Sequence, residues 1–290
     1  MEHLFLGTCS WKYDSWRGIL YSDRKPINYL QEYSQHYKTV EIDQWFWSLF
    51  GKNRVVLPSP STVREYLESV PPDFKFSIKL PNSLTLTHFY QKNKKEPLIA
   101  NPHFLSLELL NKFLESIEPL RKNLGPLMFQ FEYLNKQKMP SQTVFQEKFA
   151  HFVKRLPSGF QYAVEIRNPN YLNNEYFEFL RAHGLSHVFL QGYYLPSIVD
   201  LYKKFKAVLE QRVIIRLHGP EREEIETRSA GNWNQIIQPR DEELKRIAEI
   251  VKDLLEKKME VYVNVNNHYE GSAPLTIKRL EKFLSNLNGE

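Results

Sequence analysis

Short runs of apolar, β-branched and aromatic residues alternate along the chain with longer segments of helical periodicity. Eight runs predict strands, at Leu4–Cys9, Thr39–Asp43, Phe74–Lys79, Leu127–Phe131, Tyr162–Arg167, His187–Gln191, Val213–His218 and Val261–Asn266. The segments between them predict helices over residues 26–36, 60–69, 104–122, 142–155, 174–183, 197–210 and 241–257, and a last helix after residue 274. This strict alternation indicates parallel strands joined by right-handed crossovers.

The clearest predicted helix covers residues 241–257. Its apolar residues recur at helical spacing and form one stripe: Leu244, Ile247, Ala248, Val251, Leu254 and Leu255. Asp241 is predicted to be the N-cap, and Lys257 and Lys258 in the last turn suit the helix dipole. Pro60 and Pro274 stand where two further helices can begin.

Eight strand–helix units in a chain of 290 residues predict the α/β class and favour a single (β/α)₈ TIM barrel over an open doubly wound sheet. We expect one barrel domain over residues 1–290, because neither an internal repeat nor a linker rich in Pro, Gly or Ser divides the chain. Two connections are long for a barrel, at about residues 80–103 and 219–240. Both follow strand C-termini, where barrels carry their functional loops.

The strands carry polar residues at a spacing of two, although strands of a parallel barrel are usually almost entirely apolar. Residues at that spacing share one face of a strand. The set comprises Glu41, Asp43, Lys75, Ser77, Lys79, Glu165, Arg167, Arg216, His218, Asn264, Asn266 and His268, with Gln130 and Gln191 near the ends of two other strands. We expect this set to point into the barrel axis, mostly toward its C-terminal mouth. The alternative is that pairs such as Glu165 with Arg216 are structural ion pairs.

The composition excludes some classes of protein but does not identify a ligand. The chain has 39 Lys and Arg against 34 Asp and Glu, a net charge of +5, which permits an anionic partner but does not by itself indicate nucleic acid. A single cysteine excludes an intrachain disulfide framework and suits a reducing compartment. No apolar run is long enough to span a bilayer, and the N-terminus lacks the pattern of a signal peptide. We therefore expect a cytoplasmic protein with no membrane partner, of undetermined oligomeric state.

Eight segments of the chain carry a family resemblance. They are GTCSWKYDSWRG (Gly7–Gly18), TVEIDQWF (Thr39–Phe46), LPSPSTVREY (Leu57–Tyr66), FKFSIKLP followed by Thr87 and His88, LGPLMFQF, YAVEIRNPNY, RLHG and NNHYEGSAP. In this order they resemble the YecE-like family, also called the domain-of-unknown-function seventy-two family, over essentially the whole chain. The resemblance implies a (β/α)₈ barrel and implies no reaction.

The resemblance also identifies individual residues that match the pattern of the family. The family-like residues are Trp11, Tyr13, Trp16, Glu41, Lys79, His88, Gln130, Glu165, Arg167, Arg216, His218, Asn266, Asn267 and His268. Asp43 stands where Asn is usual in the family, Gln191 where Asp is expected, and Pro220 where Arg is usual. Extra residues around GKNRVV lengthen the loop after the second strand, and a longer stretch follows RLHG. The mouth is therefore expected to differ from the family average.

Two candidate functions of this site would rely on charged side chains alone. One is recognition of a phosphate or carboxylate by Lys79, Arg167, Arg216 and the histidines, because the arginine fork matches those anions. The other is acid–base catalysis, such as hydrolysis, by Glu41 and Glu165 with Lys79 and His218. Against both stands charge pairing: if the arginines pair with the carboxylates, these stay ionised and only orient other groups.

Two further chemistries are weaker. A divalent metal could be held by His218, His268 and either Glu165 or Asp43, but the sequence has no HExxH pair and no Cys cluster, so a metal cofactor is not favoured. Cys9 could be a nucleophile, but a lone free cysteine is usually a buried packing residue.

Aromatic residues flank the first two strand ends, namely Trp11, Tyr13, Trp16, Trp45, Phe46 and Trp47. We expect most of them to pack the loops, and a stacking wall for a base or sugar is the functional alternative. Trp233 is either a lid anchor or part of a loop core, and Lys92–Lys95 is expected to be a solvated loop tip.

These features predict a barrel mouth that binds an anionic small molecule, a nucleotide-like ligand or, less strongly, a nucleic-acid fragment. The residues expected to bind it are Trp11, Tyr13, Trp16, Asp43, His88, Gln130, Arg167, Arg216, Asn266, Asn267 and His268. The rival hypothesis is a barrel that binds a ligand or a partner without catalysis.

Overall fold

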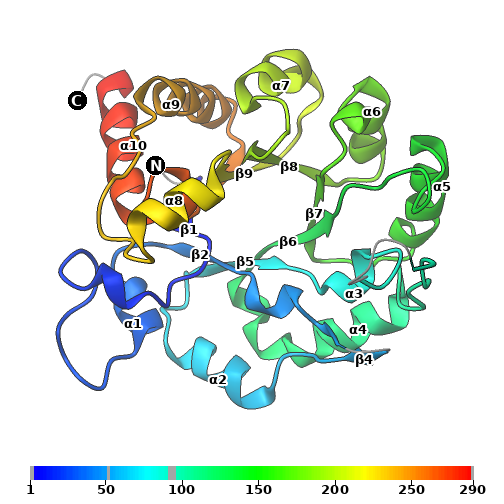
Figure 1. The fold of residues 1–290 in the computed structure, drawn as a ribbon, viewed down its shortest axis with the longest axis horizontal. Helices are drawn as coiled ribbons and strands as arrows, with labels where there is room; N and C mark the ends of the chain where they lie inside the picture. The colour runs from blue at the N-terminus through cyan, green and yellow to red at the C-terminus, as the bar shows by residue number, and fades with distance from the viewer. Residues whose placement is uncertain (1–2, 51–52, 91–95, 289–290) are drawn as a thin grey trace.

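In a computed structural model, which describes residues 3–50, 53–90 and 96–288, eight parallel strands form a nearly closed sheet surrounded by helices (Figure 1). The strands are β1 (Leu4–Thr8), β2 (Thr39–Ile42), β5 (Lys75–Lys79), β6 (Leu124–Phe131), β7 (Gln161–Ile166), β8 (Ser186–Gly192), β9 (Arg212–Gly219) and β10 (Glu260–Val265). Their order in the sheet is β1-β10-β9-β8-β7-β6-β5-β2. The predicted barrel class is therefore confirmed.

The barrel closes between β1 and β2 with few ladder bonds. A parallel bridge joins Cys9 to Glu41. Below it, the backbone N–H of Thr8 donates to the hydroxyl of Tyr33 over 2.8 Å, and that hydroxyl donates to the carbonyl oxygen of Thr39 over 3.0 Å. Gly7 lets the two strands approach, because a Cβ at this position would overlap the carbonyl oxygen of Thr39. A phenol and a glycine thus complete the closure.

The helices follow the predicted segments and lie outside the strands (Figure 1). They are α1 (Tyr29–Tyr33), α2 (Pro60–Glu68), α4 (Leu107–Ser116), α5 (Gln142–Val153), α6 (Asn174–Ala182), α7 (Ile198–Phe205), α9 (Asp241–Glu256) and α10 (Ala273–Asn288). Ser59 accepts a hydrogen bond from the N–H of Thr62 and places Pro60 at the first helical position, as expected.

The prediction of Asp241 as the N-cap of α9 is wrong. Arg240 holds the cap position without a side-chain cap bond, and Asp241 is the first helical residue. The backbone N–H of Arg240 donates to the carboxylate of Glu270, and Asp241 accepts from Arg279 over 2.6 Å. Tertiary partners from the end of the barrel therefore replace the local cap.

Three elements within the long connections escape the sequence pattern. A short hairpin of β3 (Leu49–Phe50) and β4 (Arg54–Val55) occupies the lengthened loop after β2. The connection after β5 holds α3 (Asn82–Thr85), and the one after β9 holds α8 (Arg222–Ser229). All three are too short or too polar to show periodicity. Lys92–Lys95 lies outside the described residues.

The barrel separates two apolar regions. The residues predicted to face the helices, among them Val40, Ile78, Val164 and Val263, belong to the large core between strands and helices. Inside the barrel lies a small separate cluster of Met128, Ala163, Val188, Ile214 and Tyr262, with Phe5 packed against it. This cluster forms an apolar floor toward the N-terminal ends of the strands. Within the described part of the chain, no helix is both long and apolar enough to cross a membrane.

Candidate functional site

The polar residues lie directly above the apolar floor. Because alternate residues share a face, the positions two residues beyond Met128, Ala163, Ile214 and Tyr262 also point inward. These positions are Gln130, Glu165, Arg216 and Asn264, and all four side chains are at least nine-tenths buried. The predicted inward face is therefore present on these strands, and its polar part begins halfway up the barrel.

Arg216 is the centre of this polar layer. Its Nε and one Nη donate to the two carboxylate oxygens of Glu41, both over 2.7 Å, and its other Nη donates to Glu165. The side chains of Arg216, Glu41 and Glu165 are at most 2 % exposed. Arg216 thus joins β2, β7 and β9 across the barrel, and each of its three nitrogens donates to a carboxylate.

The same ion pairs fix the charge of Glu165. Burial disfavours its ionised form, but Arg216, Arg167 and Lys79 outweigh burial and lower the pKa of Glu165 to about 2. A carboxylate with this pKa stays ionised at neutral pH and is a poor general acid or base. The lowered pKa therefore favours the orienting role for Glu165, and Arg216 binds both carboxylate oxygens of Glu41.

Arg167 occupies the next level toward the mouth. Its Nε donates to Glu165 over 3.1 Å, and its guanidinium carbon lies 4.8 Å from the centre of the Tyr193 ring. Its side chain is 24 % exposed. Neither Nη atom has a hydrogen-bond partner among the described residues. Of the predicted anion-binding arginines, this is the one with donors free at the mouth.

Lys79 and Asp43 stand at the ends of neighbouring strands β5 and β2. Burial lowers the pKa of Lys79, and the positive charge of Arg216 lowers it further. Burial raises the pKa of Asp43, and the negative charge of Glu41 adds to this. The two values therefore move toward neutral pH, as in pairs of groups that exchange protons.

His218 lies between Cys9 and Tyr193. Its Nε2 is 3.7 Å from the Cys9 sulfur, and its Nδ1 is 3.5 Å from the Tyr193 hydroxyl. Burial and the charge of Arg216 hold the pKa of His218 well below its usual value, so the ring is neutral. Burial also raises the pKa of the Cys9 thiol. Cys9 is therefore protonated and buried, which fits the packing interpretation.

Several buried polar atoms in the barrel have no partner in the described structure. They are Oγ of Ser77, Oε1 of Gln130, and both amide atoms of Asn264. An unpaired buried polar atom is costly, so this layer holds hydrogen-bonding capacity that the protein itself does not use.

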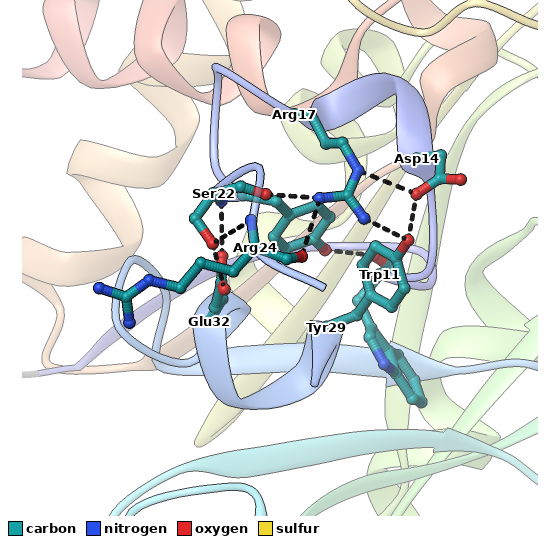
Figure 2. A network of polar contacts seen from close by, with 8 residues as sticks. Trp11, Asp14, Arg17, Ser22, Arg24, Tyr29 and Glu32 are labelled. Atoms are coloured by element: carbon teal, nitrogen blue, oxygen red, sulfur yellow. Dashed lines mark hydrogen bonds and ion pairs between the residues drawn. The ribbon is translucent and has the colours of Figure 1, made fainter. Parts of the chain in front are cut away.

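A network of polar contacts holds the loop after β1 (Figure 2). Arg17 donates to Asp14, to the Tyr29 hydroxyl and, over 2.6 Å, to the carbonyl oxygen of Ser22. Glu32 accepts from both the backbone N–H and the hydroxyl of Ser22 over 2.7 Å. Because Tyr29 and Glu32 belong to α1, this network fastens the loop to that helix.

The aromatic residues of this loop divide into two groups. Trp11 packs edge-on against Tyr66, and Trp16 is fully buried, so both pack the loop as most of these residues were expected to do. Tyr13 lies on Trp16, and burial together with the charge of Asp43 raises the pKa of Tyr13 to about 12. Only Tyr13 of these three therefore stands near a charged residue of the mouth.

The loop after β9 covers another part of the mouth. His268 lies between Oδ1 of Asn266, at 2.5 Å, and Oε1 of Glu226 on α8, at 2.8 Å. Trp233 packs edge-on against His268, and its backbone N–H donates to Ser15 over 3.1 Å. The contacts of Trp233 thus join this loop to the loop after β1, and His268 serves to attach α8.

The remaining predicted residues have local partners. Asn267 accepts from the N–H of Ala273 at the start of α10, and Nδ1 of His88 lies 2.9 Å from the Thr87 hydroxyl. Gln191 does not point into the barrel. It shares the outward face of β8 with Phe189, donates to Glu243 on α9 and accepts from Ile198 on α7. The inward placement of Gln191 is therefore corrected.

The metal hypothesis gains no support. In residues 3–50, 53–90 and 96–288, no three His, Cys, Asp or Glu side chains are grouped to hold a metal ion. Of the suggested ligands, Glu165 is bound by two arginines and His268 by Asn266 and Glu226.

Beyond the strand ends lies a set of exposed aromatic side chains, of which sequence reasoning named Trp47 but missed Tyr90, Tyr133 and Tyr194. Trp47, Tyr90, Tyr133 and Tyr194 are each at least half exposed. Trp47 and Tyr90 lie 6.3 Å apart, and Tyr133 and Tyr194 lie 6.2 Å apart, between ring centres. Their positions in the sequence could have identified them, because each follows the C-terminal end of a strand within about a dozen residues.

Comparison with known proteins agrees with the fold. The family described as "Protein of unknown function DUF72" matches residues 5–289. The UPF0759 protein YecE of Escherichia coli K12 is 24 % identical over 169 residues, which are 58 % of this chain and 50 % of that protein. The aligned region thus spans half of that relative.

Solved structures give the same result. A DUF72 family protein from Enterococcus faecalis has a TM-score of 0.67 at 22 % identity, covering 97 % of this chain and 95 % of its own. One from Thermotoga maritima has a TM-score of 0.63 at 23 % identity, covering 99 % of both chains. At these identities the likeness concerns the fold.

Proposed function

The chain belongs to the family of proteins of unknown function DUF72, and we propose that its barrel mouth binds a small molecule bearing a carboxylate or phosphate and supports an acid–base reaction such as hydrolysis. The observation that carries this proposal is Arg167. Its Nη donors have no hydrogen-bond partner in the described structure, while Arg216 pairs with the two carboxylates below. A guanidinium of this kind is suited to bind an oxyanion bidentately.

The reacting groups in this proposal are Asp43 and Lys79. Burial raises the pKa of Asp43 and lowers that of Lys79, so the proton of Asp43 and the amine of Lys79 are more available than in exposed residues. The neutral ring of His218 is a hydrogen-bonding partner for the ligand. Glu41 and Glu165 position Arg216 and Arg167, and the lowered pKa of Glu165 keeps its carboxylate ionised.

Replacing Arg167 with glutamine is expected to weaken binding of an anionic ligand by about 10–100-fold, because a hydrogen bond to a charged group contributes about 1.5–3 kcal/mol. The measurement is a thermal-shift titration with citrate, glucose 6-phosphate and AMP, since a ligand that binds the native state raises the melting temperature. Hydrolysis of ester or phosphate probes is followed in parallel.

Arg212→Gln is the matched control. Arg212 is also partly buried and paired with a glutamate, Glu260, but it stands at the opposite end of the barrel. If both variants changed the thermal shift equally, or if no anion shifted the wild type, the anion site would be rejected. Binding without turnover would retain the site and reject the acid–base step.

The exposed aromatic residues favour a second candidate, in which the ligand is a nucleotide or a short single strand. Trp47 and Tyr90 form one exposed ring pair and Tyr133 and Tyr194 another, and stacking on a base contributes about 1–3 kcal/mol. Arg167 lies near both Tyr90 and Tyr194, since its positive charge acts to lower the pKa of each hydroxyl.

For this candidate we expect affinity for a short oligonucleotide to fall steeply with salt. Trp47→Ala should weaken that affinity by about tenfold or more, whereas Trp47→Phe should keep most of it, because phenylalanine retains a stacking face. Fluorescence anisotropy of a labelled oligonucleotide measures both. Salt-independent binding, or equal effects of the two substitutions, would reject it.

A further inference from the structure

We propose that Lys79 is a nucleophile that forms an imine with an aldehyde or ketone bound at the barrel mouth. The inference deepens the proposed function and rests on it for one point only, that an anionic group of the ligand sits on Arg167. It assigns to the same site a substrate class, small carbonyl compounds that carry a carboxylate or phosphate.

The first observation is that the ammonium group of Lys79 lacks a polar partner. Lys79 is the last residue of β5, and its side chain is 7 % exposed. No carboxylate oxygen lies within 4.0 Å of Nζ among the described residues, and Nζ makes no hydrogen bond there. The centre of the Phe46 ring lies 4.1 Å from Nζ.

The second observation is that the nearby acids are engaged elsewhere. Glu41 and Glu165 influence Lys79 electrostatically, but Arg216 binds the carboxylates of both. Asp43 is also near and retains its proton more readily than an exposed aspartate. A lysine with a purely structural role in a barrel would be expected to take one of these carboxylates as its partner.

These surroundings favour the neutral amine. A charged ammonium group with three donors and no acceptor is costly to bury, and the neighbouring positive charge of Arg216 opposes protonation as well. An amine that is desolvated and near another cation is the form of lysine that attacks carbonyl carbon. The ring of Phe46 packs against Nζ and fixes its position without supplying a hydrogen-bond acceptor.

The reaction balances without a further reagent. The Nζ lone pair forms a bond to the carbonyl carbon, and the carbonyl electron pair moves to oxygen, which takes one proton from nitrogen. The resulting carbinolamine loses that oxygen as water, with the second proton from nitrogen, and a carbon–nitrogen double bond remains. Asp43 is placed to relay these protons because it adjoins Lys79 on the next strand.

The experiment is reductive trapping on the full chain. Glyoxylate, which carries both an aldehyde and a carboxylate, is added at neutral pH with sodium cyanoborohydride, and labelled lysines are located by peptide mass spectrometry. We expect Lys79 to be labelled clearly above Lys75, because burial and Arg216 lower the pKa of Lys79 and a lower pKa leaves more of the amine neutral. Lys75 is the internal control on the same strand, where its Nζ donates to the carbonyl oxygen of Lys122.

Two comparisons separate this inference from the anion site. Acetaldehyde has no anionic group, so Arg167→Gln should reduce labelling by glyoxylate but not by acetaldehyde. If Arg167→Gln had no effect with either probe while Lys79 was labelled selectively, the imine would stand and the anion site would fail. If citrate raised the melting temperature in an Arg167-dependent way but Lys79 was labelled no more than Lys75, the anion site would stand and the imine would be overturned.

Discussion

Replacing Arg216 with methionine is expected to lower the free energy of unfolding by about 3–5 kcal/mol, the range found when one partner of a buried ion pair is removed. The physical reason is that Glu41 and Glu165, each at most 2 % exposed, would lose the cation that compensates their charges. Urea unfolding at pH 7.5 measures the loss. Arg181→Met, which removes an exposed arginine paired with Glu178, should change stability by less than about 1 kcal/mol.

Adding Glu41→Gln and Glu165→Gln to Arg216→Met should recover much of the lost stability, because no uncompensated charge is then buried. This rescue separates charge from packing. If the triple variant were no more stable than Arg216→Met, the loss would have to be assigned to the cavity left by the arginine.

The difference in stability between the wild type and Arg216→Met is predicted to depend on pH. The folded-state pKa of Glu165, about 2, is below its ordinary value of 4.5. The stabilisation is therefore complete above pH 4.5 and is lost as the pH falls toward 2. In Arg216→Met, Glu165 keeps only the hydrogen bond from Arg167 and should bind protons more readily in the folded state than it does in the wild type. The stability difference between the wild type and the variant should therefore shrink below pH 4.5, and a difference that grew there would contradict the assignment.

The inward face of the barrel could be predicted because alternation is a property of the strand itself. Glu165 and Arg167 are two residues apart, as are Arg216 and His218, so each pair had to share a face. Gln191 was misplaced because it lies two residues from Phe189 and therefore shares the face of β8 that Phe189 turns to the helices. A consistent application of the two-residue period would have placed it outside.

The pairing within that face could not be predicted. Which acid Arg216 selects depends on the distances across the barrel, and the sequence contains no information on those distances. Glu41 precedes Arg216 by 175 residues, and Arg216 proves to bind both Glu41 and Glu165. For the same reason the sequence could list Lys79 with the other bases but could not show that, among the described residues, it lacks a carboxylate partner. The exposed aromatic pairs also form between loops that are distant in the chain.

Acid sensitivity at mildly acidic pH is expected to come in part from His187, on the outer face of β8. Its ring is packed edge-on against Phe177 and Phe189, with ring centres 4.9 Å and 4.6 Å away, and its Nδ1 lies 3.2 Å from the Tyr176 hydroxyl. Burial lowers the pKa of His187 to about 3, against an ordinary value of 6.5. The unfolded chain therefore binds the proton more tightly than the folded chain, and stability falls as the pH decreases from 6.5 toward 3.

His187→Leu removes this proton-binding site and should flatten the pH profile. A pH of 5 lies about 1.5 units below the ordinary pKa of 6.5, which is the pKa of His187 in the unfolded chain. The wild type should therefore lose about 2 kcal/mol of stability between pH 7.5 and pH 5 that the variant does not lose. Burial also lowers the pKa values of His218 and His268, so the variant should keep some acid sensitivity. Urea unfolding at several pH values measures the two profiles.

Tyr176→Phe is the control, because it removes the hydroxyl near Nδ1 but leaves the titrating ring, so its profile should parallel that of the wild type. If wild type and His187→Leu instead differed by a constant amount from pH 7.5 to pH 5, His187 would not be the buried neutral group that its packing implies.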